Sequence, residues 1–263
     1  MAEPFGSWQL ESLIAVGGLG EVWRATRSGA VVALKRMHTH LVRNDLACRQ
    51  FALEQRLATE LPRHRCVVHA IEHGAIAGRP YVALELAAGH DLRRIVTPPV
   101  TRSAAAPTRV VLPPARALAI VRAACDAAAH IHTNGWIHGD INPSNLIVDG
   151  EHAVLIDLGV ARRDGEAGVV RGTHAYMAPE QVRGESWTPA TDVFALGVVL
   201  WELIAGERLF HRGPPWLSMA AVVEATPPVL ADPLLDAIAR AALAKDPAQR
   251  IASAAELAAR LCN

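Results

Sequence analysis

Three residues in the stretch "IHGDINPSNLIV", at positions 137–148, have the types and spacing that transfer of a phosphoryl group needs: His138, Asp140 and Asn145. Asp140 could orient an attacking hydroxyl group and accept its proton. Asn145, five residues later, could hold a metal ion that bridges the phosphates. Asp and Asn are also ordinary turn residues, so the loop by itself does not establish this chemistry.

A lysine inside an apolar strand is a second candidate. The run "VALK" ends at Lys35, where a buried ammonium group is costly unless an anion faces it. Glu54, on the helix expected next along the chain, is the predicted partner. This ion pair would aim the ammonium group at the α- and β-phosphates of a nucleotide. A lysine at the sheet edge that extends into solvent is the alternative.

Three further segments could bind a nucleotide and its metal ion. The Gly-rich run "AVGGLGEVWRA" at 15–25 would let backbone N–H groups approach phosphate oxygens, although a plain hairpin turn explains the same glycines. In "YVALELAAGHDL", the backbone of Glu85 and Ala87 could bond an adenine edge, and Asp91 could accept from ribose hydroxyls. In "LIDLGVA", Asp157 ends an apolar strand, where a carboxylate is expensive unless it binds Mg²⁺ or another donor.

The composition favours a globular enzyme or binding domain over a nucleic-acid or membrane protein. Of 263 residues, 51% are hydrophobic, and 26 basic residues balance 26 acidic ones, so no nucleic-acid partner is expected. The first residues lack the pattern of a signal peptide, so none is expected, and the most apolar segment, 193–206, is too short to cross a bilayer. Four cysteines without CxxC spacing argue against zinc and disulfides and favour a reducing, cytoplasmic location. The oligomeric state stays open.

The hydrophobic pattern predicts a β-rich first half and a helical second half. Strands are expected at 8–16, 20–27, 30–37 and 79–86. Helices are expected at 44–61, 114–133, 190–205, 215–225, 231–243 and 252–261. The first helix would be capped by Asn44 or Asp45, and the segment 97–114, rich in Pro, Ala, Ser and Thr, would be an irregular loop.

The run "RGTHAYMAPEQ" at 171–181 is the most specific motif of the chain. Together with the motifs above, from Gly17 to Arg250, it resembles the eukaryotic-type Ser/Thr protein kinases of bacteria. The resemblance implies an α+β, bilobal fold with a small antiparallel-sheet N-lobe at 1–87 and a larger helical C-lobe at 88–263. It also implies transfer of the γ-phosphoryl group of ATP, with Mg²⁺ or Mn²⁺, to Ser or Thr of a protein or peptide substrate.

The same resemblance assigns roles to individual residues. It implies catalytic roles for Asp140, Lys35, Glu54, Asn142 and Thr173. It implies nucleotide binding by Ala15, Gly17, Gly18, Leu19, Gly20, Val22, Ala33, Lys35, Glu85, Ala87, Asp91 and Ile147, and metal binding by Asn145 and Asp157. It further implies that Glu180 pairs with Arg250 of "KDPAQR" and that Asp192 of "TDVFALG" braces the catalytic loop.

Two positions of the catalytic loop depart from the family pattern. Gly139 stands where an Arg is usual, and that Arg is often neutralised by a phosphorylated residue of the activation segment. Residues 159–172 contain no Ser, Thr or Tyr, so activity independent of phosphorylation there is predicted. Asn142 replaces a Lys that stabilises charge on the transferring group. Losing such a contact costs on the order of 10² to 10³ in rate, which predicts a slow kinase.

Two other functions remain open. A catalytic loop without the Lys also resembles small-molecule phosphotransferases of the aminoglycoside and choline kinase type, although those generally lack the block at 171–181. A pseudokinase that binds a nucleotide or a partner without catalysis is the third interpretation. A pure scaffold has no chemical need for Lys35, Asp140 and Asp157 together, which favours the enzyme.

Overall fold

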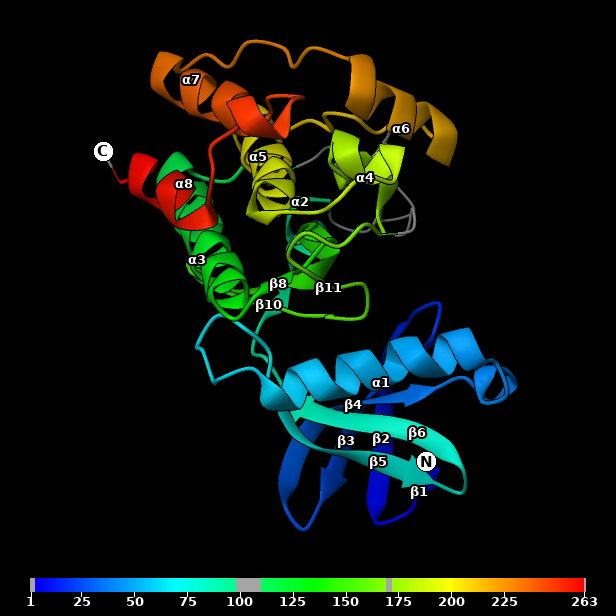
Figure 1. Cartoon of the computed structure of the whole chain (residues 1–263). Helices are drawn as coiled ribbons and strands as arrows, with labels where there is room; N and C mark the ends of the chain where they lie inside the picture. The colour runs from blue at the N-terminus through cyan, green and yellow to red at the C-terminus, as the bar shows by residue number, and fades with distance from the viewer. Residues whose placement is uncertain (1–2, 98–109, 169–171, 263) are drawn as a thin grey trace. The chain divides into compact units, whose positions relative to one another are not determined.

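The computed structural model describes residues 3–97, 110–168 and 172–262 of the chain (Figure 1). The chain forms two compact units. The first comprises Met1–Ala87 and Asp157–Gly159, and the second comprises Ala88–Ile156 and Val160–Asn263. Sheet dominates the first unit and helix dominates the second, so the predicted α+β class is confirmed.

The first unit is built on a six-stranded antiparallel sheet with the strand order β1-β2-β3-β4-β6-β5. Its strands are β1 (Glu3–Phe5), β2 (Trp8–Val16), β3 (Gly20–Arg27), β4 (Ala30–Met37), β5 (Ala70–Ile76) and β6 (Arg79–Glu85). The bounds of β2, β3 and β4 coincide with the predicted runs, and β6 ends one residue earlier than predicted. The sequence analysis missed β1 and β5, because β1 is very short and β5 places Glu, His and Gly among its apolar residues.

Helix α1 (Asp45–Glu60) packs against strands β5 and β6 of this sheet (Figure 1). The predicted cap is present, because the Asn44 side chain accepts a hydrogen bond from the backbone N–H of Ala47 at 3.0 Å. The buried face of α1 includes Phe51, Glu54 and Leu57. Burial of Glu54 among apolar neighbours already indicates that it needs a cationic partner.

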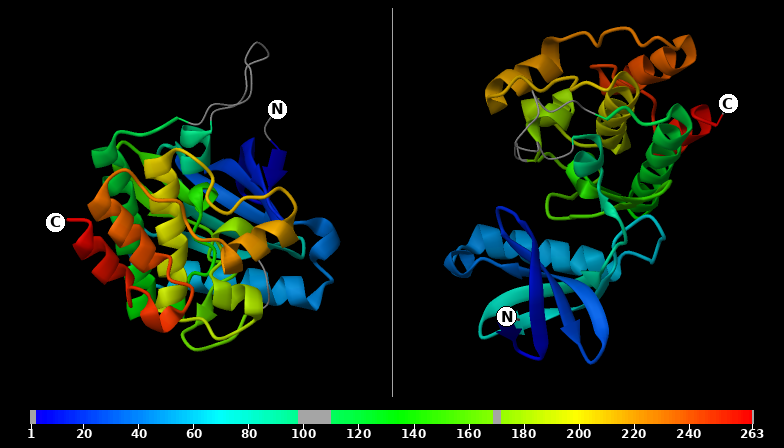
Figure 2. Two further views of the ribbon diagram at one scale, coloured as in Figure 1. Left: turned by 90° about the horizontal axis from the view of Figure 1, so that it is seen from above. Right: turned by 180° about the vertical axis from the view of Figure 1, so that it is seen from behind.

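The second unit is mainly helical. Its helices are α2 (Leu92–Val96), α3 (Pro114–Thr133), α4 (Pro179–Arg183), α5 (Pro189–Ala205), α6 (Pro215–Glu224), α7 (Pro233–Ala242) and α8 (Ala254–Arg260). Helices α3 to α7 each begin at a proline, whose fixed φ and missing N–H suit the first helical position. Helix α5 is buried over most of its length, and α3, α7 and α8 all pack against it (Figure 2).

Short strands of the second unit hold the loop at 138–145. Strand β8 (Trp136–Ile137) precedes this loop and pairs with β11 (Arg162–Arg163). The strands β7 (His90–Asp91), β9 (Leu146–Asp149) and β10 (His152–Leu155) form a second antiparallel sheet, in the order β10-β9-β7. Because β8 and β9 bracket the loop, both of its ends are fixed by strand pairing.

The helix predicted at 114–133 is present as α3, in which Ala117 and Ile120 are fully buried and Leu118 is half-buried. Most of the loop predicted at 97–114 falls on residues 98–109, outside the described part of the chain. Among the described helices, none is long and apolar enough to span a membrane.

The tight approach of β3 to β4 gives a first testable prediction. A β-carbon at Gly20 would overlap the carbonyl oxygen of Arg36 and lie 3.2 Å from the Cα of Met37. We expect Gly20→Ala to lower the free energy of unfolding by about 1 to 3 kcal/mol. Gly18→Ala is the matched control, because nothing lies within 4 Å of a β-carbon there, and it should change stability by less than about 0.5 kcal/mol. Equal losses in chemical denaturation would contradict this account.

Candidate active site

Several predicted nucleotide-binding residues lie in one row across the sheet of the first unit. Lys35 of β4 is paired with Val22 of β3 on one side and with Val82 of β6 on the other. Ala15 of β2 is in turn paired with Val22. Ala33 lies two residues before Lys35 and is therefore on the same face of the sheet. The antiparallel register thus brings together predicted residues, from Ala15 to Lys35, that are up to twenty positions apart in the sequence.

Lys35 is held between two carboxylates. Its Nζ lies 2.5 Å from Oε1 of Glu54 and 3.3 Å from Oδ1 of Asp157. Burial favours the neutral amine, but the charges of Asp157 and Glu54 outweigh burial and raise the pKa of Lys35 above its usual value. Lys35 therefore stays cationic at neutral pH. The predicted ion pair is present, while its catalytic role stays a prediction.

In the contact between Lys35 and Glu54, the charged form of Glu54 is the less favoured of the two. Burial, together with the negative charge of Asp157, raises the pKa of the Glu54 carboxyl to about 7, although Lys35 opposes the shift. One cause is visible in the geometry: Oε2 of Glu54 is buried and has no hydrogen-bond partner among the described residues. Lys35 carries its charge throughout, so the protonation of Glu54 decides the charge of the pair. The 2.5 Å contact becomes a full ion pair when Glu54 loses its proton, above about pH 7.

Asp157 has the backbone geometry of a constrained residue. Its φ of 65° lies in the left-handed region, which Asp adopts more readily than most residues. Its Oδ1 accepts a hydrogen bond from the backbone N–H of Gly159 at 3.2 Å in addition to the contact with Lys35. The side chain is 46% exposed, unlike that of Glu54. An exposed carboxylate of this kind is a suitable oxygen ligand for Mg²⁺.

The Gly-rich turn between β2 and β3 presents its backbone to solvent. The N–H of Gly17 donates to the carbonyl of Gly20 at 2.8 Å, and the N–H of His38 donates to the carbonyl of Leu19 at 3.0 Å. Gly17 and Gly18 are both exposed, and no atom would meet a β-carbon at Gly18. The turn is therefore fixed at its base and unobstructed at its tip, as a phosphate-binding loop requires.

In the second unit, Asp140 is oriented by three donors. Its Oδ1 accepts from Nδ2 of Asn142 at 3.0 Å and from the backbone N–H of Thr173 at 2.9 Å. Its Oδ2 accepts from Nδ2 of Asn145 at 3.1 Å. A β-carbon at Gly172 would lie 3.0 Å from Oδ1, so a glycine next to Thr173 permits this close approach. Thr173 reaches the site through its backbone, whereas the sequence analysis had assigned it a catalytic role without specifying an atom.

Asn142 and Asn145 present different atoms to a ligand. Asn142 is 1% exposed, and its Oδ1 accepts from the backbone N–H of Ser144 at 2.9 Å, so both ends of its amide are engaged within the loop. The amide nitrogen of Asn145 faces Asp140, which leaves Oδ1 as the atom that a cation would meet. That oxygen suits the predicted metal ligand. In the described residues, no three His, Cys, Asp or Glu side chains gather into a metal site.

A buried carboxylate braces the loop, as predicted for Asp192. Its Oδ2 accepts from the backbone N–H of His138 and its Oδ1 from that of Gly139, both at 2.8 Å. Nε2 of His132 lies 2.8 Å from Oδ2. Burial acts to raise the pKa of Asp192, but these hydrogen bonds and the charge of His132 together hold it below its usual value.

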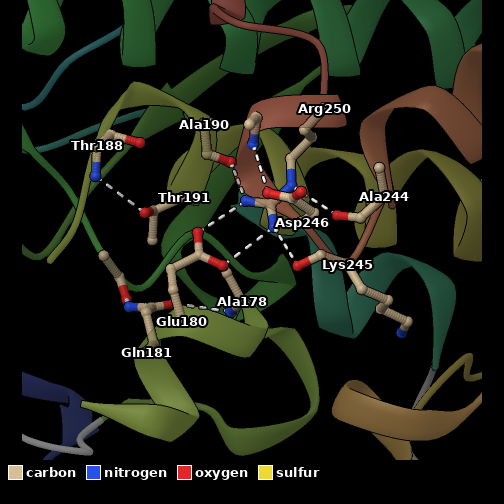
Figure 3. A network of polar contacts seen from close by, with 12 residues as sticks. Ala178, Glu180, Gln181, Thr188, Ala190, Thr191, Ala244, Lys245, Asp246 and Arg250 are labelled. Atoms are coloured by element: carbon tan, nitrogen blue, oxygen red, sulfur yellow. Dashed lines mark hydrogen bonds and ion pairs between the residues drawn. The ribbon is translucent and has the colours of Figure 1, made fainter. Parts of the chain in front are cut away.

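The predicted pair of Glu180 and Arg250 is also present (Figure 3). Nη1 and Nη2 of Arg250 lie 2.7 and 3.0 Å from the two carboxylate oxygens of Glu180, and both side chains are buried. Arg250 also donates to the carbonyls of Ala190 and Ala244, at 2.7 and 2.9 Å. Arg250 thereby ties α4, which begins within the run at 171–181, to the start of α5.

The residues proposed to hold adenine and ribose are less clearly placed. Glu85 is the last residue of β6 and Ala87 follows this strand in the first unit, and the N–H of Glu85 already donates to the carbonyl of His69 at 3.0 Å. Asp91 and Ile147 are paired between β7 and β9 in the second unit. The Asp91 carboxylate caps α2 at Arg94, with contacts of 2.9 and 3.1 Å. This capping role competes with the proposed contact to ribose hydroxyls.

Two residues of the second unit were missed by the sequence analysis. Nε2 of Gln181 donates to the carbonyl of Gly139 at 2.9 Å, and its Oε1 accepts from the N–H of Ala178 at 2.8 Å. The indole ring of Trp187 lies directly over the Cα of Gly139. The available sequence signal was the unusual glycine at 139, which leaves room for a bulky neighbour.

The comparisons with known proteins agree with this geometry. A family model described as the protein kinase domain matches residues 8–259, so the chain belongs to the protein kinase family and the expected kinase fold is confirmed. It is 32% identical over 279 residues to the serine/threonine-protein kinase PknB of Mycobacterium leprae, covering 97% of this chain and 42% of that protein. It is 33% identical over 272 residues to PknD of Mycobacterium tuberculosis, covering 97% and 39%. The chain thus spans about two fifths of the length of these relatives.

The buried Glu54 carboxyl gives a pH-dependent prediction. Because its pKa of about 7 in the folded chain exceeds the usual 4.5, its contribution to stability is present below pH 4.5 and is lost as pH rises through 7. We expect the unfolding free energy of the parent, relative to Glu54→Gln, to fall by about 3 kcal/mol between pH 4.5 and pH 8. Denaturation of both proteins across this range measures the difference, and a difference that is constant or rises with pH would contradict the assignment.

Proposed function

We propose that this chain transfers the γ-phosphoryl group of ATP to Ser or Thr hydroxyl groups of a protein or peptide. The observation that carries the proposal is the Asp140 carboxylate, which three donors hold in one orientation. The two relatives described above are named as serine/threonine-protein kinases, which supports the same activity here. Free cysteines such as Cys66 suit a reducing compartment, which supports the predicted cytoplasmic location.

In this proposal Asp140 acts as the general base. It orients the acceptor hydroxyl group and takes its proton while the hydroxyl oxygen forms a bond to the γ-phosphorus and the bond to the leaving ADP oxygen breaks. The donors at Asn142, Asn145 and Thr173 fix the carboxylate, so little reorganisation is needed at the moment of reaction. A base that is oriented before the substrate binds favours catalysis over scaffolding.

Lys35 would bind the phosphates, and Asn145 and Asp157 would supply oxygen ligands to Mg²⁺ or Mn²⁺. The two carboxylates beside Lys35 keep its ammonium group charged and fix its direction. A divalent cation would neutralise charge on the phosphate oxygens when it is bound. The oxygen donors of Asn145 and Asp157 have the chemistry that such a cation prefers.

A protein or peptide substrate is favoured over a small molecule by the segment that follows the catalytic loop. The pair of Glu180 and Arg250 fixes α4, and Gln181 links Ala178 to the carbonyl of Gly139. The hydrogen bond from Thr173 to Asp140 ties the start of the same segment to the base. A small acceptor has no evident need for a braced segment of this length.

Control by phosphorylation of the activation segment is not expected. Residues 159–172 offer no hydroxyl group, and position 139 offers no cation to bind a phosphate. In this proposal the segment is held by packing and by polar contacts that need no phosphate.

The activity is tested with radiolabelled ATP on peptides, proteins and aminoalcohols together. We expect transfer to Ser or Thr of a polypeptide, reduced roughly 10²- to 10⁴-fold by Asp140→Asn because the base is lost. Lys35→Ala should also lower transfer, whereas Glu207→Gln, an exposed carboxylate elsewhere in the second unit, should not. Transfer to aminoalcohols alone would favour the small-molecule kinase. Nucleotide binding without any transfer would favour the scaffold.

Asn142 gives a separate prediction about rate. Asn142→Lys adds a positive charge beside Asp140, and we expect kcat to rise by roughly 10- to 100-fold. The same change removes the bond from Ser144 N–H and should lower stability by about 1 kcal/mol. Asn142→Met is the matched control without charge, and it should lower kcat. If the Lys variant is no faster than the parent, the loop does not lack a cation.

A further inference from the structure

The ring of Trp187 lies where a side chain of residue 139 would extend. A β-carbon built on Gly139 would overlap Cζ3 of the indole and lie 2.9 Å from Cε3. The φ of Gly139 is +77°, a conformation that other residues adopt only with strain. Trp187 is 1% exposed, so its ring cannot move aside into solvent. The Arg that is usual at position 139 is therefore incompatible with the observed place of Trp187.

The opposite part of the same ring meets the activation segment. A β-carbon built on Gly168 would overlap Cζ2 of Trp187 and lie 2.6 Å from Cε2. The indole is thus enclosed between the backbone of Gly139 in the catalytic loop and that of Gly168 in the activation segment. Glycine at both positions lets the two backbones approach the ring more closely than any side chain would allow.

The backbone around Trp187 is bonded to the same stretch of the activation segment. Its N–H donates to the carbonyl of Glu166 at 3.0 Å, and its carbonyl accepts from the N–H of Gly165 at 2.8 Å. Ala167 and Ser186 form an antiparallel bridge next to these bonds. Residues 165–168 and 186–187 therefore make a short backbone ladder. A ladder this short needs side-chain packing to persist.

Within the described part of the chain, packing holds the indole and no polar bond to it is present. Its Nε1 is buried and has no hydrogen-bond partner among the described residues. The guanidinium carbon of Arg162 lies 5.9 Å from the ring centroid, at the outer limit of a cation–π contact. The close fit of the ring against the backbones of Gly139 and Gly168 therefore fixes its position. No charge at the ring needs to be created or removed for this contact to form.

We propose that Trp187 is a positioning residue that holds the activation segment against the catalytic loop and so replaces an anchor that would depend on phosphorylation. Packing of the indole between Gly139 and Gly168 takes the place of an Arg paired with a phosphate. The segment is then permanently in its working position, which suits a kinase without a phosphate-accepting residue at 159–172. This inference rests on the proposed kinase activity, but its structural part is measurable without it.

Amide hydrogen exchange tests the structural part directly. We expect Trp187→Leu to increase exchange at residues 163–168 by at least about tenfold, while exchange in α3 and α5 stays unchanged. Trp8→Leu is the matched control, because Trp8 is equally buried but lies in the first unit. Unchanged exchange at 163–168 in the Trp187 variant would overturn the inference. So would an increase that extends equally over the whole second unit, because Trp187 would then be an ordinary core residue.

A size-compensation experiment distinguishes specific packing from general destabilisation. Gly168→Ala should increase exchange at 163–168 in the parent because its methyl group overlaps the ring, and φ at this position is not positive. Added to Trp187→Leu, the same change should have a much smaller effect, since the overlapping ring atoms are gone. Equal effects of Gly168→Ala in both backgrounds would show that the two residues act independently and would overturn the inference.

Kinetics then test the positioning role, once transfer to a peptide is established. We expect Trp187→Leu to lower kcat about 10- to 100-fold by displacing the segment beside Asp140, while the KM for ATP stays within about twofold. Trp187→Phe keeps an aromatic ring and should restore most of kcat. An equal loss in both variants, or a loss confined to KM for ATP, would overturn the positioning role. Absence of transfer in the parent would instead refute the proposed function and leave the exchange results standing.

Discussion

The working geometry of the second unit depends on one buried carboxylate, that of Asp192. A carboxylate without water needs several donors, and Asp192 finds them in the backbone N–H groups of His138 and Gly139 and in His132. Satisfying this carboxylate fixes the backbone immediately before Asp140. The orientation of Asp140, the proposed catalytic base, is therefore a consequence of how a charge at the start of α5 is solvated.

Both backbone polar groups of Gly139 are hydrogen-bonded, and the space for a side chain at this position is filled. Its N–H is bonded to Asp192, its carbonyl to Gln181, and its Cα is covered by Trp187. The missing Arg is thus part of a coordinated arrangement in which glycine, a buried amide and an indole replace a buried cation. Since no charge has to be neutralised, this arrangement avoids the cost of desolvating an Arg whose partner would be a transient phosphate.

Much of the fold was predictable, because local pattern and local structure agree in β2, β3, β4 and α1. Short β-type runs bounded by turn residues predict the strands, and Asn44 predicts the start of α1. The ion pair of Lys35 with Glu54 was also predicted, because a buried charge implies a partner, and the pair of Glu180 with Arg250 was predicted from the family resemblance. The contact of Trp187 with two distant glycines was not, since packing partners 48 and 19 residues away leave no periodic signal. For the same reason the sequence did not show which atoms of Asn142 and Thr173 face Asp140.

The structure separates two functions that a Lys at position 142 would combine, orienting the base and supplying charge. Asn142 performs the first, because its amide donates both to the backbone carbonyl of Asp140 and to the carboxylate, at 3.0 Å each. Asn145 repeats the pattern from the other side, at 2.9 and 3.1 Å. The carboxylate is therefore held by two neutral side-chain amides and by the N–H of Thr173, and only the charge of a Lys at position 142 is missing. The neutral amides fix the direction of the Asp140 carboxylate, but they bring no positive charge to the loop. The loop thus keeps the geometry that orients Asp140 and lacks only the charge that a Lys at position 142 would bring, which is the electrostatic basis of the slow turnover predicted from the sequence.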